Sequence, residues 1–221
     1  MSDRTPFMPS GTVYGVLLNF RAERQALAPQ MNEPPYKAPP KAPILYIKPA
    51  NTWSASGTAI AVPASVPQVE IGATIAMVMG QDAQAVKAGD ALKYVAGYVL
   101  MNDLSVQHTS FYRPPVKYKC LDGFLGVGPA CVAAQAAGDP ARFTLAVHVN
   151  GALRQSVDFA NLVRNAAQLL ADVSDFMTLN LGDVLMLGCD AGRPLARAGD
   201  RIEISASGFE TLRNTLVPEA A

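Results

Sequence analysis

Residues 111–128 read FYRPPVKYKCLDGFLGVG, and shortly before them residues 97–105 read GYVLMNDLS. The earlier stretch is an apolar run that leads to Asp103, which is typical of a buried strand. The later stretch sets Arg113 and Lys119 among prolines and glycines that restrict the backbone. Together they predict a strand that delivers a carboxylate to a pocket and a rigid loop that delivers cations. Such a pocket suits an anionic small molecule, with or without a divalent metal ion.

The composition limits the class of protein. The chain has 221 residues, half of them hydrophobic, which is enough for one large core. We expect a single domain over residues 1–221, in which residues 1–60 pack on residues 65–221. Lys and Arg together number 18, as do Asp and Glu, so no overall charge favours nucleic acid or an anionic membrane.

The same composition indicates a cytoplasmic protein. The N-terminus lacks the apolar segment of a signal peptide, and the apolar runs are shorter than the roughly 18 residues that span a bilayer. The three cysteines are isolated, with no CxxC pair. They argue against a zinc site and fit a reducing compartment.

The hydrophobic pattern predicts many strands and few helices. Short apolar runs rich in aromatic and β-branched residues indicate strands at residues 12–19, 44–48, 68–80, 97–100, 142–149, 151–155, 184–187, 201–206 and 208–217. Asn150 and Gly151 predict a type I′ hairpin turn. Helices are expected at residues 21–29, ending before Pro29, near residues 89–95, and at the amphipathic stretch 161–176. The four prolines in residues 31–41 predict an extended loop or lid.

Because helices and strands do not alternate regularly, we expect an α+β fold with a mixed or antiparallel sheet. The sequence contains neither GxGxxG nor GxxxxGK[ST], the motifs of dinucleotide and phosphate-binding folds. It also lacks GxSxG, so a serine-histidine-aspartate triad is not favoured.

Few side chains remain as candidates for chemistry. His148 lies in an alternating strand pattern and is interpreted as structural, whereas His108 has either a structural role or one that depends on titration near neutral pH. Asp103 is either a turn cap or a buried carboxylate that needs a partner. Lys119, expected on a partly buried strand, needs an anion, which Asp122 or a substrate carboxylate would provide.

The motif YRP…K…DG, preceded by GY…ND, resembles the fumarylacetoacetate hydrolase family. GDVLMLG at residues 182–188 and IKPANTW at residues 47–53 extend the resemblance to about residues 11–217. KAPPKAP and FMTLNLGD point to the homoprotocatechuate-pathway branch, whose members are bifunctional decarboxylase/isomerases. Many of these enzymes consist of two homologous halves, and this chain resembles the N-terminal half.

The resemblance implies a mixed β-sheet roll with a few peripheral helices. It also implies Mg²⁺ or another divalent cation, held by two glutamates of an E-x-E strand and by Asp103. That cation would bind the substrate's oxygens and stabilise an enolate. Lys119 matches the family lysine that hydrogen-bonds this anion, and Asp122 would orient it. The implied substrate-binding residues are Arg113, Tyr112, Lys48 and Asn19.

The chain departs from the family pattern at the metal ligands. The E-x-E positions fall on Gly72 and Thr74, neither of which supplies a carboxylate. Asp103 alone is a poor Mg²⁺ site, because this ion prefers several oxygen ligands. Glu70, two residues before Gly72, would face the same side of a regular strand and is a candidate to compensate.

Other departures lie around the same pocket. Glu23 and Ala26 stand where relatives carry a water-activating His-x-x-Glu pair, so hydrolysis of the acylpyruvate type is not expected. Cys189 replaces a threonine that contacts substrate in relatives, and Gln107 stands where arginine is common.

The resemblance implies a subunit of the 5-oxopent-3-ene-1,2,5-tricarboxylate decarboxylase and 2-hydroxyhepta-2,4-diene-1,7-dioate isomerase. The substrate would be a small 2-oxo dicarboxylate or tricarboxylate, and the assembly a homodimer or a complex with a homologous, metal-competent subunit. Two alternatives stay open: a catalytically degenerate partner that stabilises an active paralogue, and a lyase or isomerase that polarises its substrate with cations in place of metal.

Overall fold

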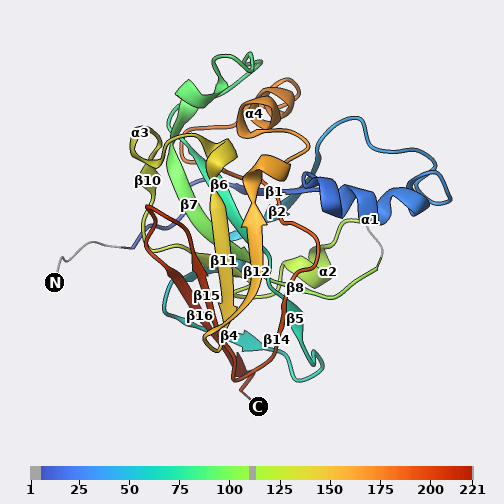
Figure 1. Cartoon of the computed structure of the whole chain (residues 1–221), viewed down its shortest axis with the longest axis vertical. Helices are drawn as coiled ribbons and strands as arrows, with labels where there is room; N and C mark the ends of the chain where they lie inside the picture. The colour runs from blue at the N-terminus through green and yellow to red at the C-terminus, as the bar shows by residue number, and fades with distance from the viewer. Residues whose placement is uncertain (1–5, 110–112, 221) are drawn as a thin grey trace.

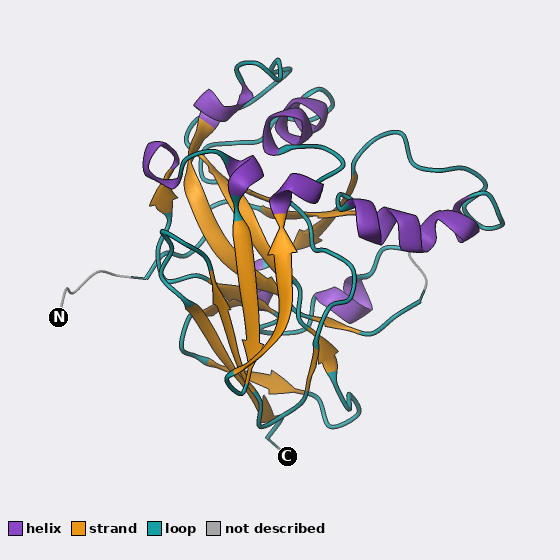
Figure 2. Cartoon of the chain, in the orientation of Figure 1, coloured by secondary structure: helices purple, strands orange, loops and turns teal. Residues whose placement is uncertain are grey.

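The computed structural model describes residues 6–109 and 113–220. Its strands form three sheets, and helices lie around their rim (Figures 1 and 2). The largest sheet has the order β2-β1-β13-β6-β7-β9-β3, and β10 pairs with β7. Its strands are β1 (Val13–Leu17), β2 (Ile44–Lys48), β3 (Trp53–Ala55), β6 (Ala73–Met79), β7 (Val95–Asp103), β9 (Leu125–Val127), β10 (Val132–Ala133) and β13 (Val184–Met186).

The second sheet has the order β12-β11-β15-β16-β4. It contains β4 (Ala59–Val62), β11 (Thr144–Val149), β12 (Ala152–Asp158), β15 (Arg201–Ser205) and β16 (Leu212–Pro218). A small third sheet joins β5 (Val69–Glu70), β8 (Ser105–Val106) and β14 (Leu195–Ala196). The α-helices are α1 (Arg21–Met31), α2 (Val116–Lys119), α3 (Ala134–Ala137) and α4 (Ala166–Ser174). The 3₁₀ turns are η1 (Ala50–Thr52), η2 (Ala91–Tyr94), η3 (Pro140–Arg142) and η4 (Phe159–Asn161).

The two larger sheets and helix α4 pack against each other through a shared hydrophobic core. Every residue of β6 is buried, because ATIAMVM has an apolar or small side chain on both faces, as a strand inside a covered sheet requires. Side chains from the largest sheet, such as Ile75 and Leu100, share one hydrophobic cluster with Ile204 and Leu216 of the second sheet. Helix α4 adds Leu169 to this cluster.

These features confirm the predicted α+β class with mixed sheets. β1 runs parallel to β13 and antiparallel to β2. The predicted hairpin joins β11 and β12, and Asn150 and Gly151 have φ of 52° and 81°, as a type I′ turn needs. None of the helices in the described residues is long and apolar enough to cross a membrane.

Three local predictions were wrong. Helix α1 continues through Pro29 to Met31, where the buried side chain of Met31 anchors its last turn. A proline this close to the C-terminal end removes only one helical hydrogen bond. Lys119 lies at the end of the one-turn helix α2, not on a strand.

The third error concerns residues 68–80, which form two strands in different sheets. The chain breaks at Gly72, whose carbonyl accepts a hydrogen bond from Asp103 N at 2.8 Å. A Cβ atom at Gly72 would collide with the carbonyl oxygen of Asp103. The break therefore brings the end of β7 directly against Gly72 and separates Glu70 from β6.

Candidate functional site

The end of β7 places the carboxylate of Asp103 inside the protein, with 1% of the residue exposed. One oxygen, Oδ1, lies 2.9 Å from Lys48 Nζ, and the other, Oδ2, lies 2.6 Å from Lys119 Nζ. Tyr46 also donates its hydroxyl hydrogen to Oδ2 at 2.5 Å. We call Asp103, Lys48, Lys119 and Tyr46 the buried charge cluster.

A glycine allows Tyr46 to reach this cluster. Tyr46 pairs with Gly15 across β1 and β2, and its ring lies over the glycine backbone. Any Cβ atom at position 15 would collide with the ring. Gly15 is therefore needed for close approach, although nothing in the strand pattern of residues 12–19 marked it.

Lys48 is fully buried, and the protein itself accepts its hydrogen bonds. Its Nζ donates to the carbonyl oxygens of Lys119 and Phe124, the latter at 2.7 Å, and lies 3.3 Å from that of Leu104. These three carbonyl oxygens account for all three N–H groups of an ammonium ion, and Asp103 Oδ1, 2.9 Å from Nζ, is its ion-pair partner. The structure therefore places Lys48 as an internal cation that ties β2 to residues 119–124. Lys48 was predicted to contact substrate, but its ammonium ion has no free N–H group with which to do so.

Lys119 reaches the cluster from the other side. Its Nζ lies 4.7 Å from the centre of the Tyr46 ring, where a cation is attracted to the aromatic face. Only the hydrogen bond to Asp103 occupies its donors among the described residues. The side chain also lines a cavity, although only 1% of the residue is exposed.

Burial and the charge of the ion-pair partner act in opposite directions on Lys48 and Asp103. Burial lowers the pKa of Lys48, although the charge of Asp103 opposes this shift. Burial alone would raise the pKa of Asp103, but Lys119 and Lys48 outweigh it and hold the pKa well below the usual range. Burial, followed by the charge of Asp103, raises the pKa of Tyr46 well above 10. Asp103 is therefore an anion and Tyr46 a neutral hydrogen-bond donor at physiological pH.

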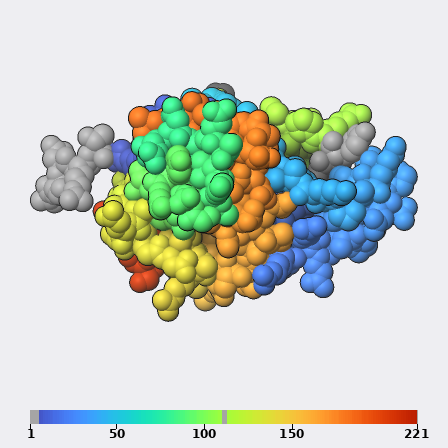
Figure 3. Space-filling model, turned by 90° about the horizontal axis from the view of Figure 1, so that it is seen from above, coloured from blue at the N-terminus to red at the C-terminus, as the bar shows by residue number. Residues whose placement is uncertain are grey.

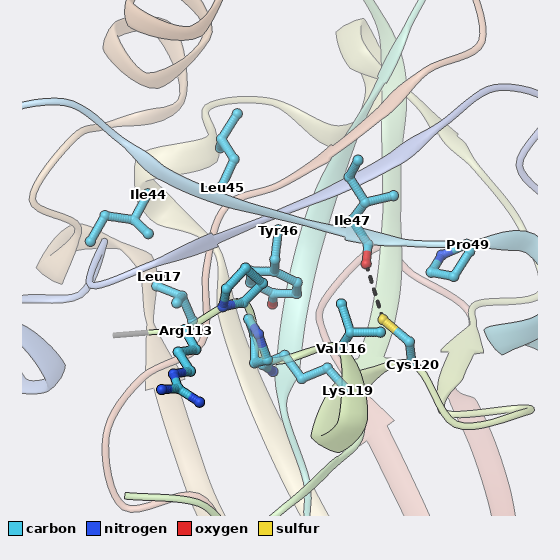
Figure 4. Close-up of a pocket in the computed structure, with 12 residues that line it drawn as sticks. Leu17, Ile44, Leu45, Tyr46, Ile47, Pro49, Arg113, Val116, Lys119 and Cys120 are labelled. Atoms are coloured by element: carbon cyan, nitrogen blue, oxygen red, sulfur yellow. Dashed lines mark hydrogen bonds between the residues drawn. The ribbon is translucent and has the colours of Figure 1, made fainter. Parts of the chain in front are cut away.

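A cavity of about 520 Å³ adjoins Lys119 and Tyr46. Apolar side chains of β2 and α2, such as Ile44 and Val116, form most of its wall, and Arg113 lies at its edge (Figure 4). Arg113 is exposed and makes no hydrogen bond or ion pair that joins it to another described residue. The predicted pair of cations, Arg113 and Lys119, thus lines one cavity. Tyr112 lies outside the described residues.

Two further predicted site residues have other partners. Asp122 is exposed and accepts a hydrogen bond from Asn51 Nδ2 at 2.6 Å, whereas the carboxylate that orients Lys119 is Asp103. Asn19 is buried, and its amide bonds to the backbone of Leu187 and Arg164. Its place is structural: it joins the end of β1 to the segments before α4 and after β13.

A second group of charges surrounds a cavity of about 340 Å³. Glu23 of α1 accepts hydrogen bonds from Arg193 Nη2 at 2.5 Å and from Leu18 N at 2.7 Å. Burial raises the pKa of Glu23, and Arg193 opposes this shift. Glu70 lies 3.6 Å from Arg193 Nη1, so its carboxylate faces this arginine. Arg193 was not predicted from the sequence, because an isolated arginine after a glycine carries no motif.

The histidine and cysteine candidates lie near these groups. His108 lines the second cavity, its ring stacks on Tyr118 at 4.8 Å, and its Nδ1 lies 2.9 Å from the carbonyl of Val106. Cys189 is buried, which raises the pKa of its thiol to about 12. Gln107 pairs with the exposed side chain of Gln68.

The residues around Asp103 do not fit the divalent metal that the family resemblance implies. Gly72 has no side chain, and Thr74 donates its hydroxyl hydrogen to the carbonyl of Gly188 at 2.6 Å. Two ammonium ions occupy the Asp103 oxygens that a cation would need. Within residues 6–109 and 113–220, no three His, Cys, Asp or Glu side chains gather in a way that could hold a metal ion.

Comparison with known proteins gives one consistent result. Residues 12–217 match the family model described as fumarylacetoacetate (FAA) hydrolase, C-terminal. The chain is 41% identical over 209 residues to a 4-hydroxyphenylacetate degradation bifunctional isomerase/decarboxylase of Escherichia coli. That match covers 95% of this chain and 48% of the relative, so the chain spans about half the length of the relative.

Solved structures share the fold. One is 5-carboxymethyl-2-hydroxymuconate delta-isomerase from Mycobacterium smegmatis, with a TM-score of 0.83 and 27% identity over 99% of this chain and 83% of that chain. Another is maleylpyruvate hydrolase from Sphingobium sp. SYK-6 in complex with manganese(II) ion and pyruvate. Its TM-score is 0.79, with 25% identity, and the match covers 96% of this chain and 72% of that chain. The match to the family model over most of the chain, together with these neighbours, shows that the chain belongs to the fumarylacetoacetate hydrolase family.

Proposed function

We propose that this chain is a subunit of an enzyme that decarboxylates 5-oxopent-3-ene-1,2,5-tricarboxylate and isomerises 2-hydroxyhepta-2,4-diene-1,7-dioate. The observation that carries the proposal is the cavity that brings Lys119 and Arg113 together. Two cations at one largely apolar cavity suit a small unsaturated molecule with carboxylates at its ends. Similarity to isomerase/decarboxylases supports this substrate class.

The two cations have different tasks in this proposal. Arg113, at the exposed edge, pairs with a terminal carboxylate of the substrate and sets its orientation. Lys119, held by Asp103, donates a free N–H to the oxygen on which the enolate charge develops. The apolar wall formed by β2 and α2 lowers the local polarity and strengthens that hydrogen bond.

The partner is part of the proposal. The chain spans about half of its isomerase/decarboxylase relative, and the residues around Asp103 do not fit a metal. We propose that it forms one domain of the family type and assembles with a homologous chain that keeps the metal-binding carboxylates. In the assembly that chain contributes the metal-dependent step, and this chain binds and orients an anionic substrate.

A second candidate function is that of a catalytically degenerate partner. The observation that favours it is that both Asp103 oxygens contact groups of the protein itself, Lys48, Lys119 and Tyr46, as a purely structural cluster would also show. In that case the chain stabilises its homologue and binds no substrate of its own.

Turnover distinguishes these functions. The ultraviolet absorbance of 2-hydroxyhepta-2,4-diene-1,7-dioate is followed with the chain alone and with a metal-competent homologue. Substrate loss that depends on this chain, and that falls in Lys119→Met but not in Lys117→Met, supports the proposed function. Lys117 is the matched control because it lies on the same helix turn and is exposed. Equal rates for both variants in a folded assembly would favour the degenerate partner.

A further inference from the structure

We infer that Lys48 and Lys119 take the place of a divalent cation as the permanent counter-charge of Asp103, so that this position is closed to metal ions. The inference rests on family membership and on the buried charge cluster, not on the proposed reaction. It assigns Lys48 a role in the site that differs from contact with a substrate.

The carboxylate of Asp103 is already in contact with two cations. Each oxygen of Asp103 has its own ammonium ion, at 2.9 Å and 2.6 Å, and Oδ2 also accepts the Tyr46 hydroxyl at 2.5 Å. Oδ1 accepts no hydrogen bond from a described residue, but the ammonium ion of Lys48 lies where a metal cation would have to approach it. A metal ion would have to displace two buried ammonium ions and deprive both of their carboxylate partner.

Lys48 cannot withdraw from Asp103 at low cost. Lys48 is fully buried, and its ammonium ion donates to three backbone carbonyls, those of Leu104, Lys119 and Phe124. A neutral amine would have one donor fewer than these three acceptors require. Because a buried charge without a partner is unfavourable, the Lys48–Asp103 pair is a fixed part of the fold.

The surroundings of positions 72 and 74 leave no room for the carboxylate ligands that this site lacks. Position 72 lies against the carbonyl of Asp103 and admits no Cβ atom without movement. Position 74 is fully buried and its hydroxyl bonds to Gly188. Tyr46, whose ring lies over Gly15, donates its hydroxyl hydrogen to Asp103 Oδ2 beside Lys119. Gly72, Thr74 and Tyr46, which come from different elements, are therefore all compatible with a cluster that is closed to metal ions.

The test uses the purified full chain and Mn²⁺ alone. After treatment with EDTA and desalting, the protein is titrated with MnCl₂, and free Mn²⁺ is measured by electron paramagnetic resonance. In parallel, broadening of backbone amide NMR signals by the paramagnetic ion locates any bound Mn²⁺. We expect no saturable binding, no broadening centred on residues 102–104 and the same Tm in MnCl₂ and in EDTA.

The possible outcomes are clear. Saturable binding that broadens the signals around Asp103 would overturn the inference, above all if binding is lost in Asp103→Asn and retained in Asp122→Asn. Asp122 is the matched control because its carboxylate is exposed. Binding confined to surface carboxylates, without broadening around Asp103, supports closure. Since the NMR readout uses the unaltered chain, the result does not depend on whether Asp103→Asn folds.

Discussion

Replacing Lys48 with methionine tests whether Lys48 is a structural cation or a substrate ligand. Methionine keeps much of the apolar stem but removes the ammonium ion. Asp103 then loses one of its two counter-charges, and the carbonyl of Phe124 loses a donor at 2.7 Å. Breaking a buried ion pair by removing one partner costs about 3–5 kcal/mol. For a protein of this length that corresponds to a loss of roughly 6–20 °C in Tm.

Equilibrium unfolding in urea measures this change. Fluorescence of Trp53 is a suitable signal, because this tryptophan is unique in the chain and its Nε1 donates to the Lys48 carbonyl at 3.0 Å. The control, Lys117→Met, removes an exposed lysine and should change the free energy of unfolding by less than about 0.5 kcal/mol.

A double-mutant cycle isolates the ion pair. If Lys48 and Asp103 compensate each other, Lys48→Met combined with Asp103→Asn is less destabilising than the sum of the single changes. A Lys48→Met protein within about 1 kcal/mol of wild type would refute the reasoning, since that value lies well below the range for a broken buried pair. If activity were then lost at unchanged stability, Lys48 would be a substrate ligand after all.

Three further predictions concern other parts of the site. Arg113→Gln should weaken substrate binding about tenfold, measured as the KM of the assembly. A charge-assisted hydrogen bond is worth about 1.5–3 kcal/mol, and the lower end applies because Arg113 is exposed. An unchanged KM would show that Arg113 does not bind the substrate. Gly72→Ala should destabilise the chain by about 1–3 kcal/mol in urea unfolding through overpacking against Asp103, and a neutral effect would contradict the close approach. Because burial raises the pKa of Glu23, its ionisation lowers stability as pH rises from the unfolded value of about 4.3 through the folded pKa. The Tm of wild type minus that of Glu23→Gln should therefore fall over this pH window, and a constant or rising difference would contradict the account.

The sequence was sufficient for the elements whose pattern is local. Alternating or continuous apolar runs predicted β7 and the β11–β12 hairpin, and the resemblance named the family that the comparison confirmed. Asp103 was predicted at the end of a buried strand, and it lies there. The cavity also brings together Arg113 and Lys119, which were selected from one short loop.

The partners in the site were harder to predict because they are far apart in the chain. Lys48 and Asp103 are 55 positions apart, and Glu23 and Arg193 are separated by 170. Nothing in the local pattern links such residues, so Asp122, the nearest carboxylate in sequence, was chosen for Lys119. Pairing depends on the sheet order, in which β2 and β7 lie apart yet both direct side chains to the same space.

The break at Gly72 shows a related limit. A continuous strand over residues 68–80 would have put Glu70 on the same face as position 72. The close approach of Asp103 interrupts that strand, and the carboxylate of Glu70 faces Arg193.

Seen from above, α1 and the following loop form a lobe beside the segment around residues 113–119 (Figure 3). Helix α1 and residues 113–119, which are more than 80 positions apart in the sequence, therefore lie side by side near the candidate site.

The most direct measurement is a crystal structure of the chain grown with MnCl₂, with anomalous scattering data collected at the manganese edge. The account predicts no anomalous peak beside Asp103, with the amines of Lys48 and Lys119 within hydrogen-bond distance of its two oxygens. A manganese peak coordinated by Asp103, with either lysine displaced, would contradict the claim that internal ammonium ions replace the metal in this member of the family.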